Sequence, residues 1–285
     1  MDNPELRQRK PVDQAENDEE EPQPRKEHPY LKYGLTMQIV RSLLISAWFD
    51  CCCVIIVVTQ LIGSPLYLIN KDYYYSYMAM TKQNFGLAIT ALTEWGCPTY
   101  VRVSGDKSVR GQIQLMEDGR LKMQFPERLV LVANHQVYTD WIYLWWLSYT
   151  NMMHGRLYII LKESLKYIPV LGQGMFFYGF IFMARKWISD KPRLEHRLQK
   201  LKTQHEGSKS DSPAFDPMWL LIFPEGTNLS ENTKRRSDEY GQKLGILPLR
   251  HAILPRSTGL FFCLQQLKGT VDWVYDCTVA YEGPP

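Results

Sequence analysis

The feature that most constrains this chain is an apolar stretch near its amino terminus. Residues 42–70 carry a single charge, on Asp50, and the twenty residues 51–70 carry none. Twenty consecutive uncharged, mostly aliphatic residues are enough for a helix to cross the hydrocarbon core of a bilayer. We therefore predict a membrane-embedded helix here, and we interpret Asp50 as a helix-end residue rather than a buried polar group.

Glycine and proline interrupt the apolar stretch before its end. Gly63, Ser64 and Pro65 follow one another, and proline both lacks an amide donor and clashes with the preceding helical turn. A kink or a tight return is expected here, which leaves two topologies open: one full span, or a helical hairpin within one leaflet. The basic residues that precede the stretch favour a cytosolic amino terminus. They are Arg25, Lys26, Lys32 and Arg41.

Charge divides the chain into an acidic leader and a basic body. Residues 1–33 hold nine acidic and six basic residues and few large apolar ones, which predicts a disordered tail. Of the 33 Lys+Arg and 30 Asp+Glu in the chain, 27 and 21 remain after residue 33, a net charge of +6. A basic body suits a phosphate-bearing ligand or a lipid surface. Because no long basic run or basic helix is present, nucleic acid is not expected as a partner.

The six cysteines argue against a disulfide scaffold and a zinc site. Cys51, Cys52 and Cys53 are adjacent within the apolar stretch, and the other three are scattered. No Cys-x-x-Cys pair is present, so structural zinc has no support in the sequence. We expect reduced thiols.

Beyond Gly96 the pattern changes to short apolar runs that alternate with helical segments. The predicted strands cover residues 99–104, 128–133, 157–161 and 218–223. The predicted helices cover residues 141–148 and 189–205. Strands that alternate with helices predict an α/β fold with a mainly parallel sheet flanked by helices. Three regions are expected: a disordered tail (1–33), a membrane-anchoring helical segment (34–95) and a globular domain (96–285).

The first candidate site follows the strand predicted at residues 128–133. This strand runs into Asn134 and His135, and Asp140 follows five residues after the histidine, where an apolar helix begins. Positions five apart on a regular helix point about 140° away from each other, so a contact requires His135 to precede the helix. Asp140 would then orient the imidazole while His135 removes a proton. The alternative is a strand-end histidine beside a capping aspartate, without a catalytic role.

Two further groups of residues could bind a ligand. The strand predicted at residues 218–223 runs into Glu225, Gly226 and Thr227. The glycine allows a close approach of the backbone to a ligand, and the threonine offers both a donor and an acceptor. Arg185 ends another apolar run, and its guanidinium suits bidentate binding of phosphate, although a strand-closing arginine would look the same.

Taken together and in this order, the motifs resemble those of the glycerolipid and lysophospholipid acyltransferase family, which is typified by 1-acylglycerol-3-phosphate acyltransferases. The residues that carry the resemblance are Asn134-His135 with Asp140, Gly179-x-Ile181-Phe182-x-x-Arg185, Phe223-Pro224-Glu225-Gly226-Thr227, and the proline block Leu254-Pro255-Arg256-Ser257-Thr258-Gly259. Residues 162–172 and 275–281 are similar to the branch of lysocardiolipin and lysophosphatidylinositol acyltransferases. The resemblance covers about residues 40–282.

The resemblance implies an enzyme that transfers a fatty acyl group from acyl-CoA to the free hydroxyl of a lysophospholipid. His135 would be the general base and Asp140 its orienting partner, without an acyl-enzyme, a metal or another cofactor. The expected partners are acyl-CoA, the lysophospholipid acceptor and the lipid bilayer, in an endoplasmic-reticulum-type membrane. The residues implied to position the acceptor are Arg185, Glu225, Gly226 and Thr227, with Lys162 as a weaker phosphate contact.

Departures from the family pattern bear on the acceptor. Asn228 stands where many members carry an arginine, and Ala184 where many carry an acidic residue. The loss of one phosphate-directed base favours an acceptor whose phosphate is a diester with a headgroup, such as lysophosphatidylinositol or lysocardiolipin. Lysophosphatidic acid is the alternative acceptor. Since relatives usually continue past residues 279–281, a shortened carboxyl terminus is expected, which leaves a catalytically silent membrane scaffold as a second alternative.

Overall fold

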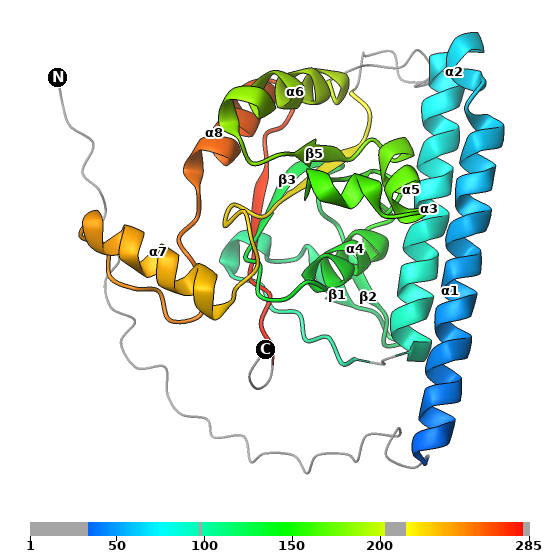
Figure 1. The fold of residues 1–285 in the computed structure, drawn as a ribbon, viewed down its shortest axis with the longest axis horizontal. Coiled ribbons are helices and arrows are strands. Elements are labelled where there is room, and N and C mark those ends of the chain that lie inside the picture. Colours follow the sequence, from blue (N-terminus) through cyan, green and yellow to red (C-terminus); the bar gives the residue numbers. More distant parts are fainter. Residues whose placement is uncertain (1–33, 97–98, 203–214, 282–285) are drawn as a thin grey trace. The chain divides into compact units, whose positions relative to one another are not determined.

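The computed structural model describes residues 34–96, 99–202 and 215–281 (Figure 1). Its internal contacts divide the chain into residues 1–42 and residues 43–285. Of the first unit, residues 34–42 are described, and from Leu35 onward they form the beginning of a helix. The tail predicted for residues 1–33 lies outside the described residues, as does Cys97.

The second unit alternates helices with strands along the chain (Figure 1). The helices are α1 (Leu35–Gly63, shared with the first unit), α2 (Leu66–Ile69), α3 (Lys71–Gly96), α4 (Asp140–Thr150), α5 (Leu171–Phe177), α6 (Trp187–Lys200), α7 (Glu231–Lys243) and α8 (Ser257–Leu267), with 3₁₀ turns η2 (Lys107–Val109) and η3 (Glu163–Tyr167). The strands are β1 (Ile113–Leu115), β2 (Leu121–Met123), β3 (Arg128–Ala133), β4 (Leu157–Lys162), β5 (Ile181–Met183), β6 (Met218–Ile222) and β7 (Val274–Cys277).

The main sheet has five strands in the order β5-β4-β6-β3-β7, and every neighbouring pair is parallel. The predicted α/β class with a mainly parallel sheet is therefore confirmed. Because all five strands point the same way, their carboxyl ends meet at one edge of the sheet. That edge carries the loops after β3 and β6, which lie next to each other at the centre of the sheet.

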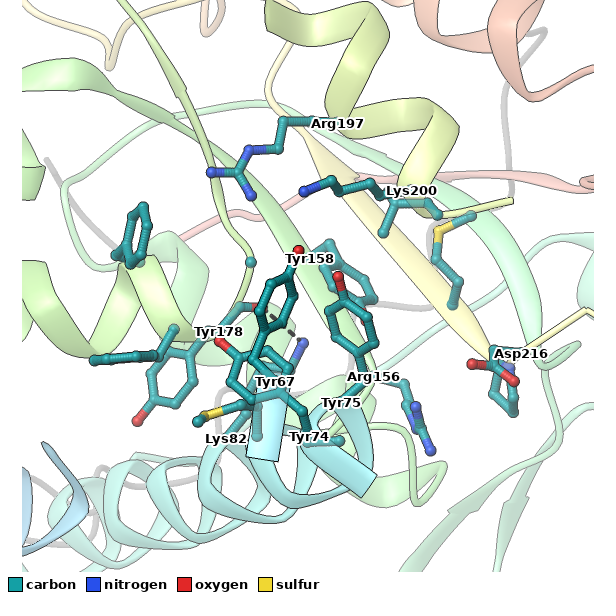
Figure 2. A pocket seen from close by; sticks show the side chains of 18 of the residues that line it. Tyr67, Tyr74, Tyr75, Lys82, Arg156, Tyr158, Tyr178, Arg197, Lys200 and Asp216 are labelled. Atoms are coloured by element: carbon teal, nitrogen blue, oxygen red, sulfur yellow. Dashed lines mark hydrogen bonds between the residues drawn. The ribbon is translucent and has the colours of Figure 1, made fainter. Parts of the chain in front are cut away.

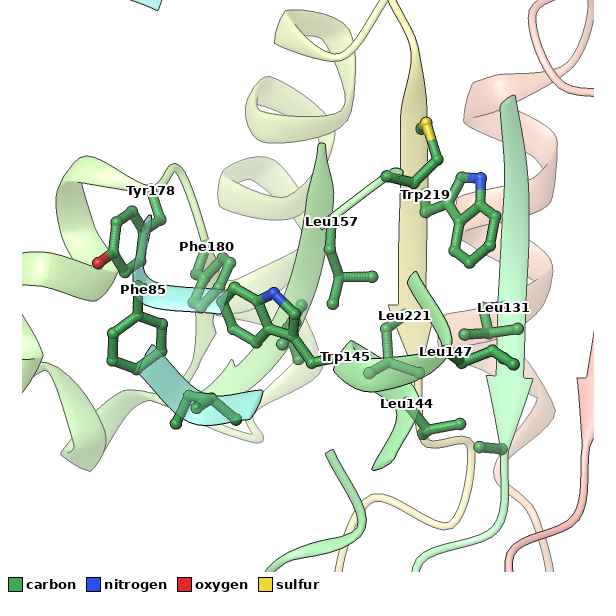
Figure 3. Packing of buried hydrophobic residues seen from close by; sticks show 14 of the residues in the cluster. Phe85, Leu131, Leu144, Trp145, Leu147, Leu157, Tyr178, Phe180, Trp219 and Leu221 are labelled. Carbon is green, nitrogen blue, oxygen red and sulfur yellow. The ribbon is translucent and has the colours of Figure 1, made fainter. Parts of the chain in front are cut away.

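Two hydrophobic clusters cover the two faces of the sheet. Leu129 and Leu131 of β3 point to one face and Val130 to the other, as the two-residue period of a strand requires. On the first face the strands pack against α3 and α4, where Trp145 is almost fully buried (Figure 3). On the second face they pack against α6 and α8. Burial on both faces explains why β3 and β6 are almost continuously apolar in sequence.

The apolar stretch forms one long helix that ends where the glycine and proline occur. Within the described residues, Leu35–Ile69 is the one segment long and apolar enough to cross a membrane, and only 11% of its 18-residue apolar window is buried in the protein. A core helix of a water-soluble domain would be mostly buried. The predicted break is confirmed, since α1 ends at Gly63 and Pro65 precedes α2. Asp50 lies exposed in the middle of α1, so the prediction that it ends a helix is wrong.

Helix α3 runs back alongside α1 and joins it to the sheet (Figure 1). The rings of Trp48 and Trp95 lie 5.2 Å apart between the two helices. On its other side α3 inserts Phe85, whose ring lies 5.2 Å from that of Trp145 on α4 (Figure 3). Cys53 and Ile56 of α1 belong to the same buried cluster as the strands. Residues of α3 and of the second half of α1 are thus part of the core of this unit.

The structure corrects one predicted strand. Residues 99–104 form no strand; Tyr100 is 89% exposed, and the run has no neighbouring strand to pair with. Strand propensity depends on packing against neighbours, which this run lacks. The carboxyl-terminal strand, β7, ends at Cys277, and residues 279–281 lie outside the sheet. The backbone N–H and carbonyl of Val279 form hydrogen bonds with the side chain of Asn134 instead of with a neighbouring strand.

Predicted strands 128–133, 157–161 and 218–223 correspond to β3, β4 and β6, with ends that shift by one residue at most. The helix predicted at residues 141–148 is α4. The helix predicted at residues 189–205 is α6, which starts two residues earlier and ends at Lys200. Residues 203–205 lie outside the described part of the chain.

Candidate active site

The pairing of β3 with β6 brings two of the sequence motifs together at the carboxyl edge of the sheet. The strands are in parallel register, with Val132 opposite Ile222, so His135 and the loop that contains Glu225 leave the sheet side by side. The backbone N–H of Leu229 donates to the carbonyl of His135 at 2.8 Å. The imidazole of His135 also stacks on the ring of Phe223, with centroids 4.4 Å apart.

The carboxylate of Asp140 is completely buried and accepts hydrogen bonds from three donors. His135 Nδ1 lies 2.9 Å from Oδ2, and the backbone N–H of Val137 donates to the same oxygen at 3.1 Å. The hydroxyl of Tyr281 donates to Oδ1 at 2.5 Å. Because Asp140 opens α4, its charge also interacts favourably with the amino-terminal end of that helix.

This geometry fixes the orientation of the His135 ring. With Nδ1 directed at Asp140, the other ring nitrogen, Nε2, is the one left for an incoming group. The side chain of His135 is 19% exposed, so the ring is not sealed inside the core. A neutral imidazole held by a carboxylate through Nδ1–H presents a basic Nε2, the arrangement used by general bases in many hydrolases and transferases.

Tyr281 is a site residue that the motif spacing did not identify. Burial, together with the hydrogen bond to the Asp140 carboxylate, raises the pKa of its hydroxyl, which therefore remains a donor. Its position depends on Asn134, whose side chain accepts from the Val279 N–H at 2.7 Å and donates to the Val279 carbonyl at 3.0 Å. The only sequence signal was the similarity of residues 275–281 to one branch of the family.

Glu225 lies beside the His135–Asp140 pair, which we call the dyad, and its carboxyl group has an unusual electrostatic environment. Its side chain is 5% exposed, and among the residues that the structure describes its Oε2 atom has no hydrogen-bond partner. Burial raises the pKa of the Glu225 carboxyl to about 7; the negative charge of Asp140 adds to this, and a backbone hydrogen bond from His135 opposes it. A carboxyl group with a raised pKa can donate to a ligand hydroxyl when it is protonated and accept from one when it is ionised.

The turn after Glu225 depends on the backbone conformation of a glycine. Gly226 has a φ of +72°, a conformation that side chains rarely adopt, and its N–H donates to the carbonyl of Phe223. Thr227 follows in a half-buried position. The side chain of Arg256 runs next to Gly226, and its backbone N–H donates to Pro224 at 2.7 Å. Arg256 therefore adds a positive charge beside the turn, which the sequence prediction left out of the site.

Lys162 and Arg185 reach the same edge of the sheet, from β4 and from the loop after β5. Lys162 pairs in register with Met183, two residues before Arg185. Both side chains are exposed. Within residues 34–96, 99–202 and 215–281, no hydrogen bond or ion pair joins either cation to His135 or Glu225. The structure thus brings together His135, Asp140, Glu225, Gly226 and Thr227. Lys162 and Arg185 lie along the same edge of the sheet, outside this group.

The loop at Arg185 is held by a buried aspartate that the sequence prediction missed. Arg185 has a φ of +65°, in the left-handed region. The backbone N–H groups on either side of it, of Ala184 and Lys186, both donate to the carboxylate of Asp190 at 2.9 Å. Asp190 is 1% exposed, so the clamp is part of the packed structure. It fixes a backbone conformation that would otherwise be costly for arginine.

Metal-binding side chains are not gathered at this site. Across the described part of the chain, no three His, Cys, Asp or Glu residues come together in a way that could hold a metal ion.

Comparisons with known proteins all indicate the same family. The sequence pattern of the family described as Acyltransferase matches residues 101–282. An uncharacterized acyltransferase of Schizosaccharomyces pombe is 40% identical over 81% of this chain and 63% of its own length. The 2-acyl-1-lysophosphatidylinositol acyltransferase of Saccharomyces cerevisiae is 37% identical over 90% of this chain and 71% of its own length. Lysocardiolipin acyltransferase 1 of Danio rerio is 38% identical over 54% of this chain and 38% of its own length.

For two of these three relatives, therefore, the chain spans less than two thirds of their length. No solved structure matches the chain.

The environment of Glu225 predicts a measurable pH dependence of stability. An acid whose pKa is higher in the folded state, about 7 against an ordinary 4.5, binds more protons folded than unfolded between these values. Folding stability from this group is therefore present below about pH 4.5 and is lost as the pH rises to about 7. We expect the melting temperature of the wild type to fall relative to that of Glu225→Gln across this interval.

The control for this measurement is Glu239→Gln, which removes a carboxylate that is 64% exposed on α7. Its melting temperature should follow that of the wild type at each pH. Parallel curves for the wild type and Glu225→Gln would show that the Glu225 carboxyl titrates normally.

Proposed function

The chain belongs to the acyltransferase family, and we propose that it transfers a fatty acyl group from acyl-CoA to the free hydroxyl of a lysophospholipid. The observation that carries this proposal is the His135–Asp140 hydrogen bond of 2.9 Å, at the edge of the sheet where the family motifs meet. The similarity to relatives named for lysophosphatidylinositol and lysocardiolipin supports a lysophospholipid as the acceptor class.

In the proposed reaction, Nε2 of His135 removes the proton from the acceptor hydroxyl. The oxygen attacks the thioester carbonyl of acyl-CoA and forms a tetrahedral intermediate. Its collapse breaks the carbon–sulfur bond, and the CoA thiolate takes the proton back from the imidazolium. Asp140 stabilises the imidazolium between these steps, because its carboxylate accepts the Nδ1–H throughout. A positioned base of this kind contributes a factor of about 10²–10⁴ in rate.

The proposal needs no covalent acyl-enzyme and no metal or other cofactor besides the co-substrate acyl-CoA. Backbone N–H groups near the start of α4 are suited to stabilise the oxyanion of the intermediate, since the positive end of the helix dipole points there. The four residues proposed to hold the acceptor differ in chemistry. Arg185 and Lys162 would attract its phosphate, while Glu225 and Thr227 would bind its hydroxyls.

We propose lysophosphatidylinositol as the preferred acceptor. The yeast relative with that substrate in its name aligns with 90% of this chain, whereas the lysocardiolipin acyltransferase of Danio rerio aligns with 54%. The unpaired Oε2 of Glu225 suits an acceptor whose headgroup is rich in hydroxyls. Asn228, in place of a second phosphate-directed arginine, favours a phosphate diester over the monoester of lysophosphatidic acid.

The reaction is proposed to occur at a membrane of the endoplasmic-reticulum type. The exposed apolar surface of α1 supports embedding in a bilayer, where it would bring the domain to its lipid acceptor. Long-chain acyl-CoA is delivered from the cytosol, which favours a topology with both ends of the apolar segment on that side. The packing of α1 against α3 is compatible with such a hairpin.

The experiment that tests the function offers labelled oleoyl-CoA and a panel of lysolipids to membranes that contain this chain. We expect label to enter phosphatidylinositol fastest, with lysocardiolipin and lysophosphatidic acid as slower acceptors. His135→Ala should lower the rate at least about 10²-fold because the base is lost, while membrane association is retained. The matched control is His196→Ala, an exposed histidine on α6, which should keep the wild-type rate.

Undiminished transfer by His135→Ala would contradict the proposed mechanism. A wild-type chain that acylates none of the lysolipids would indicate the silent scaffold instead. Fastest labelling of phosphatidic acid would identify lysophosphatidic acid as the preferred acceptor.

A second prediction concerns Arg185. Replacement by alanine should raise the Michaelis constant for the lysophospholipid about ten-fold and change kcat little, because a phosphate contact made equally in the ground and transition states is lost. Lys186→Ala is the matched control, since it removes the neighbouring exposed cation. A rise confined to the Michaelis constant for acyl-CoA would show that Arg185 serves the donor and not the acceptor.

A further inference from the structure

A cavity lies at the opposite edge of the sheet from His135. It has a volume of about 340 Å³ and is lined where β4 and β6 begin, by Arg156 just before β4 and by Asp216 just before β6. Figure 2 shows Arg197 and Lys200 reaching into it from α6, above the tyrosines of α2 and α3. Because the strands are parallel, their full length separates this cavity from the dyad.

The lining of this cavity, which we call the basic cavity, carries an excess of positive charge. Five of its residues are basic and one, Asp216, is acidic. The basic residues are Lys82, Arg128, Arg156, Arg197 and Lys200. The guanidinium of Arg128 is occupied by the backbone carbonyls of Thr270, Asp216 and Leu201. Even without Arg128, cations outnumber carboxylates, so the cavity is suited to an anion.

Three of these cations have no carboxylate partner. Within the described part of the chain, Lys82, Arg156 and Arg197 form no ion pair. Lys82 is the most constrained of them, since it is only 2% exposed. Its ammonium group donates to the carbonyl of Tyr178 at 3.3 Å and lies 3.7 Å from the centre of the Tyr158 ring (Figure 2). A buried ammonium group with so few partners is costly unless a counter-charge is nearby.

The same conclusion follows from the interactions among these groups. Burial lowers the pKa of Lys82, and the positive charge of Arg156 lowers it further. The positive charges of Lys82 and Arg156 therefore repel each other across the cavity. An anion between them would relieve both effects, because it would place an opposite charge next to both cations.

The position of the basic cavity indicates where such an anion comes from. Tyr67 of α2 lines it, and Tyr67 belongs to the last turns of the apolar segment Leu35–Ile69. The next two residues, Leu68 and Ile69, are 88% and 78% exposed. Tyrosines gather at the level of lipid headgroups where membrane helices end, and the cavity has further tyrosines on α3. The phosphates of a bilayer lie at this level.

We propose that the basic cavity binds the phosphate-bearing headgroup of an anionic phospholipid, at a site separate from the one where the acceptor reacts. The lipid phosphate would lie between Lys82, Arg156 and Arg197, and the tyrosine rings would contact the rest of the headgroup. The ligand is not consumed. It would join α6 and β4 to the end of the membrane helix, and would hold the domain at the bilayer surface.

The test uses the full chain in detergent micelles, with the melting temperature as the readout. The probe is dioctanoyl phosphatidylglycerol, which is anionic and is not a lysolipid. We expect it to raise the melting temperature in a saturable way, whereas zwitterionic dioctanoyl phosphatidylcholine should not. Inorganic phosphate at the same concentration should have little effect if the site requires a lipid headgroup.

The decisive variant is the double substitution Arg156→Gln with Arg197→Gln, since both side chains are half-buried and less risky for folding than Lys82. Loss of two charge-assisted contacts should weaken binding of the anionic lipid at least about ten-fold. Arg120→Gln removes an arginine whose side chain is 85% exposed, and should bind as the wild type does. His135→Ala should also bind normally, so this result does not depend on the proposed reaction.

Three outcomes would overturn the proposal. Equal stabilisation by the two lipids would show that the phosphate charge is not recognised. An effect of inorganic phosphate equal to that of the lipid would identify a site for soluble phosphate esters. Undiminished lipid binding by the double variant would show that the lipid binds somewhere else.

Discussion

The structure of the site depends on one buried charge, the carboxylate of Asp140. With no exposed surface, this group must be satisfied by protein donors, and it has three, from His135, Val137 and Tyr281. They come from the end of β3, the turn before α4 and the carboxyl-terminal segment. The His135 ring, the start of the helix and the last described residues are thereby held together, because loss of any one donor would leave the charge under-satisfied.

Much of this arrangement could be predicted from the sequence, because the central strands are buried on both faces and their apolar runs have clear ends. Strands β3 and β6, and the loops after them, follow from that pattern together with the rule that parallel strands share one carboxyl edge. The spacing of His135 and Asp140 gave a condition for their contact, namely a histidine placed before the helix, and the geometry satisfies that condition.

Long-range contacts could not be predicted in the same way. Tyr281 donates to a residue 141 positions earlier, and Asp190 clamps the backbone on both sides of Arg185; neither contact leaves a local pattern. The run at residues 99–104 has strand propensity but no neighbouring strand, whereas the short strands β1 and β2 pair around a tight turn at Gly119. The basic cavity is assembled from seven separate segments, so only the folded chain reveals it.

The central claim is that Asp140 holds His135 ready to act as a base, and the most direct test is the kcat of Asp140→Asn in the acyl-transfer assay. We predict a fall of about 10²–10⁴-fold in a protein that still folds, because the amide keeps the shape of the carboxylate but cannot stabilise the imidazolium. Asp276→Asn, at an exposed position on β7, is the matched control. A folded Asp140→Asn protein whose kcat stays within about two-fold of the wild type would contradict the account.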